Sequence, residues 1–156
     1  MSVLLTRFAR RQTLKSTERH MMADTFDMKV ITPERVFYEG TASMVEFTTT
    51  EGDIGVYAHH IPLTTVLAPG ILTITEDETK KRIAGVYSGF ARISGDNVTI
   101  LAETAEWPDE IDVSRANEAE KRARERLEAR NNDLDLVRAE TALRRALVRK
   151  RLASEK

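Results

Sequence analysis

The chain of 156 residues contains no cysteine, so disulfide bonds, thiolate zinc sites and cysteine nucleophiles are excluded. No apolar run approaches the ~20 residues that a membrane-spanning helix needs. The hydrolase, phosphate-loop and metalloprotease motifs G-x-S-x-G, G-x-x-x-x-G-K-[ST] and H-E-x-x-H are also absent. We therefore expect a protein that is not an enzyme, with no catalytic residues, no metal site and no required cofactor.

Aromatic residues make up only 6% of the chain, and the basic segment after residue 112 contains none. Stacking of bases on aromatic rings is the usual support for binding single-stranded nucleic acid, so we expect no nucleic-acid partner. His59 and His60 are adjacent, and adjacent side chains in an extended segment point apart. They are therefore a poor metal pair.

The charges are unevenly distributed along the chain. Residues 1–22 carry 5 basic and 1 acidic residue, residues 23–111 carry 6 and 15, and residues 112–156 carry 13 and 9. An acidic body thus precedes a basic tail, which suits a negative surface on a protein, a nucleotide phosphate or a nucleic acid. The alternative is a solvated helix surface with ion pairs between residues four apart.

Residues 1–22 have neither the long apolar stretch nor the cleavage site of a secretory signal. Their composition, basic and poor in acids, is compatible with an organelle transit peptide. We prefer the interpretation that Met22 is the functional start and that residues 1–22 are a disordered or non-native leader.

From Phe26 onward, apolar and polar residues alternate with a period of two, which predicts short antiparallel strands. Turn residues interrupt this alternation at 32–35, 51–55, 68–70 and 94–97. The last of these turns should close a β-hairpin. Many short strands at this spacing predict a β-sandwich or flattened barrel between about residues 25 and 105.

After Asp112 the apolar period becomes helical, with helices predicted near 112–131 and 134–152 and a break at 131–133. So short a connection predicts an antiparallel hairpin, with Asp133 or Asp135 capping the second helix. The apolar stripes are Ala116, Ala119, Ala123 and Leu127 on the first helix, and Leu136, Ala139, Leu143, Ala146 or Leu147, and Leu152 on the second. Alanine seams bury little area, at ~25 cal/mol per Å², so this hairpin should be only marginally stable alone.

The segment 111–116 is the most informative part of the chain because an acid opens a helix and a cation follows three residues later on the same face. The simple interpretation makes Asp112 a helix N-cap and leaves Arg115 solvated. The alternative is a nucleotide or switch site.

Three segments between Phe26 and Leu152 resemble the epsilon subunit of the bacterial F-type rotary ATP synthase. They are EGDIGVYAHHIPL at 51–63, the SGF and NVTILAE stretches of 88–106, and Ile111-Asp112 with Arg115-Ala116, which is similar to the ATP-binding signature of many bacterial members. The chain departs from the family pattern at 56–59, where Ile-Leu-Pro-Gly is more frequent, and at Ser88, where a second glycine is common.

The resemblance implies an α+β fold, with a ten-stranded β-sandwich over residues 23–106 and an antiparallel two-helix regulatory hairpin over 107–156. It implies a place at the foot of the rotor, against the gamma subunit and the c-ring, peripheral to the bacterial plasma membrane on its cytoplasmic side. Folded on the sandwich, the hairpin would permit ATP hydrolysis. Extended along gamma, its basic second helix would meet acidic segments of the beta subunits and stop rotation.

By the same resemblance, ATP is a possible regulatory ligand. The implied ATP-binding residues are Glu106, Ile111, Asp112, Arg115, Ala116, Arg145 and Arg149. Arg145 and Arg149 are four apart and share a helix face, so both could address phosphates while Asp112 accepts from the adenine amino group. ATP would then hold the two helices in the folded form. The alternative is the same stalk adaptor without nucleotide-controlled switching.

Overall fold

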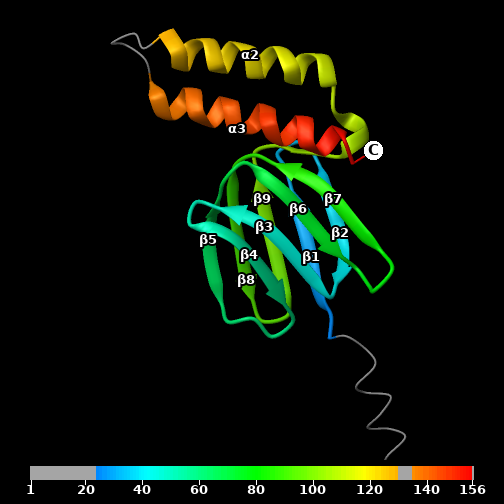
Figure 1. The fold of residues 1–156 in the computed structure, drawn as a ribbon. Helices are drawn as coiled ribbons and strands as arrows, with labels where there is room; N and C mark the ends of the chain where they lie inside the picture. Colours follow the sequence, from blue (N-terminus) through cyan, green and yellow to red (C-terminus); the bar gives the residue numbers. More distant parts are fainter. Residues whose placement is uncertain (1–23, 130–134, 156) are drawn as a thin grey trace, which may run out of the picture.

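The alternating segment forms ten strands, and two helices follow it (Figure 1). The computed structural model describes residues 24–129 and 135–155, so the predicted leader and the predicted helix break at 131–133 lie outside the described residues. The strands are β1 (Phe26–Ile31), β2 (Val36–Ala42), β3 (Met44–Thr49), β4 (Gly52–Tyr57), β5 (Leu63–Leu67), β6 (Gly70–Thr75), β7 (Lys81–Val86), β8 (Gly89–Ser94), β9 (Asn97–Ala102) and β10 (Ala105–Glu106).

The strands form one hydrogen-bonded sheet in the order β10-β7-β6-β3-β5-β8-β9-β1-β2, with β4 added beside β3. The sheet curls over on itself into a sandwich, which confirms the predicted fold class (Figure 1). Every pairing is antiparallel except that of β1 with β9, which is parallel. Alternation alone predicted antiparallel strands because it does not report the direction of a neighbour that is distant in sequence.

The core of the sandwich follows the period-two pattern of its strands. In β1, for example, Phe26, Met28 and Val30 are all buried, while the residues between them are exposed or half-buried.

Three of the four predicted turns connect strands as expected, but the prediction for 51–55 was wrong in extent. The turn there is confined to residues 50 and 51, because Gly52 adopts a φ of 131° and the chain continues at once as β4.

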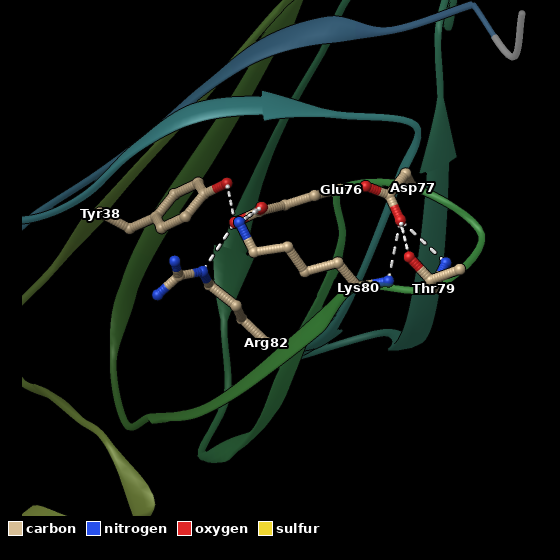
Figure 2. Close-up of polar contacts among 6 residues, drawn as sticks. All are labelled: Tyr38, Glu76, Asp77, Thr79, Lys80 and Arg82. Atoms are coloured by element: carbon tan, nitrogen blue, oxygen red, sulfur yellow. Dashed lines mark hydrogen bonds and ion pairs between the residues drawn. The ribbon is translucent and has the colours of Figure 1, made fainter.

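Side chains link β2 at one end of the sheet to β7 near the other (Figure 2). The Tyr38 hydroxyl donates to Glu76 Oε1 at 3.1 Å, and Arg82 Nε donates to the same oxygen at 2.6 Å. Lys80 also pairs with Glu76, and its hydrogen bond is the main cause that lowers the pKa of this carboxyl. Burial, followed by the charge of Glu76, raises the pKa of Tyr38 to about 12. The sandwich is thus closed on this side by a charged network centred on Glu76.

The helical part begins with a short 3-10 helix, η1 (Pro108–Glu110), followed by α2 (Val113–Ala129) and α3 (Leu136–Ala153). The Asp112 carboxylate accepts from Arg115 N at 3.0 Å, and Asp135 accepts from Arg138 N at 3.0 Å. Both aspartates are therefore N-caps, which confirms the cap predicted at Asp112. Within the described ranges, no helix is long and apolar enough to cross a membrane.

The two helices form the predicted hairpin, which lies across one end of the sandwich with α3 next to the strands (Figure 1). Leu152 is fully buried and faces β7, where a Cβ added at Gly85 would be 3.1 Å from its Cδ2 atom. The predicted seam alanines are buried except Ala119, which like Leu127 and Leu143 is half-buried. Of the two alternatives Ala146 and Leu147, Ala146 belongs to the apolar seam, because it is buried and Leu147 is exposed. The prediction for Leu136 was wrong, because it stands in the first turn of α3 and is exposed to solvent.

A buried charge was not predicted inside the hairpin. Glu120 on α2 is only 8% exposed, and its carboxylate lies 2.6 Å from Lys150 Nζ on α3 and 2.6 Å from Arg124 Nη2. The hydrogen bond from Lys150 is the main cause that lowers the pKa of Glu120. A carboxylate thus joins the two helices where the alanine seams leave little apolar area.

Two glycines with nearly the same positive φ provide a matched test of the packing of the sandwich. Gly52 and Gly89 have φ values of 131° and 133°, but a Cβ at Gly52 meets nothing within 4 Å, whereas one at Gly89 overlaps the Leu101 carbonyl and lies 2.8 Å from Ala102 Cα. Gly52→Ala should lower the free energy of unfolding by about 1–3 kcal/mol through strain alone. Gly89→Ala should lose at least about 1–3 kcal/mol more through overpacking, measured by urea unfolding. Equal losses in the two variants would contradict this packing.

Glu120 should make the hairpin sensitive to acid. A carboxyl whose pKa is lowered in the folded state stabilises that state above its ordinary pKa of about 4.3, and this stabilisation is lost as the pH falls through the lowered value. Helicity at 222 nm should therefore fall more steeply below about pH 4.3 in the native chain than in Glu120→Gln. Glu125→Gln, on the same helix with its carboxylate 3.9 Å from Lys121 Nζ, is the control. Identical acid profiles for the native chain and Glu120→Gln would refute this role.

Candidate functional site

A pocket of about 370 Å³ lies where α2 begins, and it is bounded by β10, α2 and α3. Its lining residues are Glu106, Glu110, Asp112, Arg115, Ala116, Glu118, Ala119, Arg122 and Arg149. Five of the seven predicted ATP-site residues are among them: Glu106, Asp112, Arg115, Ala116 and Arg149. The volume lies in the range of pockets that hold small molecules.

Three elements bring the lining residues together. Asp112 ends the connection into α2 as its cap, and Arg115, Ala116 and Ala119 follow on the first turns of the same helix face. Glu106 belongs to β10, where it pairs with Gly85 of β7. The backbone of Glu106 is therefore fixed by the sheet. Arg149 comes from the last third of α3, which runs back past the start of α2.

Four carboxylates and three guanidinium groups line the pocket, and some of them pair with one another. Arg149 Nε donates to Glu106 Oε2 at 2.7 Å, and Arg122 Nη1 lies 3.5 Å from Glu118 Oε2. Guanidinium groups bind phosphate oxygens through paired hydrogen bonds, and carboxylates accept hydrogen bonds from amino groups. The pocket therefore offers the two kinds of polar group that a nucleotide requires.

Arg149 and Glu106 form the most enclosed ion pair among the lining residues of the pocket. The side chains of Arg149 and Glu106 are 29% and 26% exposed, so this ion pair is screened less than a surface pair. The Arg149 guanidinium also lies 4.4 Å from the centre of the Tyr87 ring. Burial, followed by a contact with Glu106, raises the pKa of Tyr87. Arg149 thus fastens the end of α3 to both β10 and the segment that follows β7.

The structure leaves two predicted residues outside the lining of the pocket. Ile111 is 5% exposed and immediately precedes the cap, so it helps to fix the start of α2 through packing. Arg145 shares a face of α3 with Arg149, but its guanidinium contacts the sandwich at Ser88 Oγ, 3.3 Å away, and at Glu103 Oε2, 3.8 Å away. The two arginines therefore address different groups in the structure.

Sequence reasoning missed Arg122, which lines the pocket on α2. It follows Arg115 by seven residues, or two helical turns, so helical periodicity from the Asp112 motif was the signal that could have found it. Glu110 was also missed, and its carboxylate is already 2.5 Å from Arg35 Nη2. No such periodic signal marks Glu110, because it precedes α2.

The adjacent histidines do not line this pocket. His59 lies in the connection between β4 and β5 with a φ of 61°, a left-handed conformation that is uncommon for residues with a side chain. It stands at the position where the family pattern more often has glycine, and this geometry explains that preference.

The sequence and the fold were compared with known proteins. Residues 25–108 match the profile described as ATP synthase, Delta/Epsilon chain, beta-sandwich domain, and residues 109–154 match that of the long alpha-helix domain. The chain is 45% identical over 135 residues to the ATP synthase epsilon chain of Caldanaerobacter subterraneus subsp. tengcongensis, covering 86% of this chain and 97% of that one. It is 41% identical over 128 residues to the ATP synthase epsilon chain of Clostridium novyi, covering 82% and 97%.

Solved structures support the fold alone, since their sequence identity is low. A chain in the cryo-EM structure of the Euglena gracilis mitochondrial ATP synthase, OSCP/F1/c-ring, is similar with a TM-score of 0.70 at 24% identity, covering 83% of this chain and 80% of that one. A chain in the Tetrahymena thermophila mitochondrial ATP synthase central stalk/c-ring structure has a TM-score of 0.54 at 20% identity, covering 83% and 93%.

Proposed function

Because this chain belongs to the delta/epsilon chain family of ATP synthase subunits, we propose that it regulates a proton-translocating F-type ATP synthase as its epsilon subunit. Its sandwich couples the gamma subunit to the c-ring in the central stalk, and its hairpin controls ATP hydrolysis in response to ATP. The observation that carries the nucleotide response is the pocket in which α2, α3 and β10 place Asp112, Arg149 and Glu106 together.

The proposed role is regulatory and not catalytic. The partners are the gamma subunit, the c-ring and the beta subunits, and the complex holds the chain at the cytoplasmic face of the bacterial plasma membrane. Relatives named as ATP synthase epsilon chains support a place in this complex. The acidic sandwich and the basic helical segment supply the different surfaces that a stalk contact and an inhibitory contact need.

ATP fits the chemistry of the pocket. Arg115, Arg122 and Arg149 supply guanidinium groups for the phosphates, and the Asp112 carboxylate can accept from the adenine amino group while it caps α2. Arg145 would join the phosphates by turning away from Ser88 and Glu103.

A ligand in this pocket favours the docked hairpin, because the lining residues come together only when α2, α3 and the sandwich are in contact. A ligand shifts a conformational equilibrium only by its differential affinity for the two states. A change from 1:99 to 99:1 would require about 5.5 kcal/mol. ATP contacts to both helices and to Glu106 would contribute to such a difference, and a hairpin released from the sandwich would be free to reach the beta subunits.

A second candidate function is the same stalk adaptor without nucleotide control. The observation that favours it is the ion pair of Arg149 with Glu106, since this pair holds α3 on the sandwich without any ligand. The two functions are distinguished by whether ATP binds and changes docking.

Calorimetric titration with ATP tests the pocket. Arg149→Ala should weaken ATP binding roughly ten- to a hundredfold, because a charge-assisted hydrogen bond contributes about 1.5–3 kcal/mol. Arg144→Ala is the matched control, since Arg144 is exposed on the same helix and does not line the pocket. Helicity of each ligand-free variant should be recorded beside its affinity. An unchanged affinity in Arg149→Ala would favour the adaptor.

Removing the hairpin tests whether the sandwich binds the stalk without it and whether the hairpin controls ATP hydrolysis. The cut should follow Glu110, because Trp107 stacks on Phe37 at 4.3 Å between ring centroids and Glu110 pairs with Arg35. Without residues 111–156, the complex should assemble and synthesise ATP much as before but hydrolyse ATP faster, in assays of membrane vesicles. Loss of gamma binding on this truncation would contradict a sandwich that holds the stalk by itself.

A further inference from the structure

A serine and a carboxylate at the edge of the sandwich hold Arg145. Arg145 Nη2 donates to Ser88 Oγ at 3.3 Å and lies 3.8 Å from Glu103 Oε2. The Ser88 hydroxyl in turn donates to Glu103 Oε2 at 2.5 Å, so one hydroxyl links the carboxylate to the guanidinium. The pair is built on fixed backbone, because Glu103 N donates to Ser88 O at 3.0 Å where β8 and β9 run side by side.

This contact satisfies Arg145 only in part. Arg145 Nε is buried and has no hydrogen-bond partner among the described residues. A guanidinium binds a carboxylate or a phosphate most strongly through two parallel hydrogen bonds, and the Ser88–Glu103 pair does not provide that geometry. A phosphate group that offered two oxygens would therefore bind Arg145 better than the present partners do.

We propose that Ser88 and Glu103 are positioning residues for the nucleotide site, which hold Arg145 on the sandwich while the site is empty and yield it to the phosphates of ATP. This rests on the proposed ATP-binding function. Arg149 remains outside the exchange, because its partner Glu106 already lines the pocket. The chain-specific part is Ser88, which stands where the family pattern commonly has a glycine and therefore no hydroxyl.

The strength of the contact suits such an exchange. The side chains of Arg145 and Glu103 are 39% and 72% exposed, and exposed ion pairs shift an equilibrium by roughly two- to fivefold. Because the same guanidinium serves either the sandwich or the phosphates, the contact favours docking only when ATP is absent. The contact of Arg145 with the sandwich and the binding of ATP oppose each other, and this coupling is reciprocal. Once ATP has bound, the contact therefore no longer contributes to docking.

Labelling of a single introduced thiol tests this exchange in the full chain. The chain has no cysteine, and Leu152 is fully buried in the docked hairpin, so a Leu152→Cys parent reports undocking through its labelling rate. Ser88→Ala and Glu103→Gln are compared in this parent, with Ser94→Ala and Glu78→Gln as controls at exposed positions of the same sandwich. Hydrogen exchange of α3 in the same variants without the introduced cysteine gives a second measurement if that cysteine itself loosens docking.

Without nucleotide, labelling should be roughly two- to fivefold faster in Ser88→Ala and in Glu103→Gln than in the parent and controls. At saturating ATP this difference should disappear. Equal rates without nucleotide would overturn the docking contact, and a difference that persists in ATP would overturn the exchange. If ATP does not slow the labelling of the parent, both the proposed ATP site and the exchange are overturned. The labelling rates without nucleotide would still test the docking contact in that case.

Discussion

The contact of α3 with the end of the sandwich is the constraint on which the hairpin and the pocket depend. Leu152 is buried against β7 next to Gly85, and Arg149 is fixed by Glu106 and the ring of Tyr87. These contacts join α3 to the sheet, and α3 in turn carries α2 through the hairpin seam. The polar pocket exists because this arrangement places the cap of α2 beside β10.

The contacts that join α2 to α3, and the hairpin to the sandwich, are ones that water can replace. Its seam consists mainly of alanines, and its buried carboxylate, Glu120, is neutralised by Lys150 and Arg124. Apolar burial of this size contributes little at ~25 cal/mol per Å², and released charges regain their hydration. Such an element can leave the sandwich without unfolding it, which the proposed regulation requires. The ten-stranded sheet has its own core and does not depend on the helices.

Residue periodicity was sufficient to predict a sandwich or flattened barrel followed by a helical hairpin, because each pattern involves neighbours in sequence. Residue type predicted the cap at Asp112 but left the second cap open between Asp133 and Asp135. Periodicity did not predict the parallel pairing of β1 with β9 or the closure around Glu76, which join distant segments. Most of the pocket was implied by the family resemblance, and Arg122 could have been added by periodicity. The partners of Arg145 could not, since Ser88 and Glu103 become neighbours only through strand pairing.

The most direct test of ATP-controlled docking is the distance between α3 and the sandwich within the intact ATP synthase, measured between one spin label on each. With ATP in excess, docking of the hairpin predicts a single population at short distance. When ATP is removed, a second population at long distance should appear as the hairpin extends. A distance distribution that is the same with and without ATP would contradict the proposed switch and would leave this chain a fixed adaptor of the stalk.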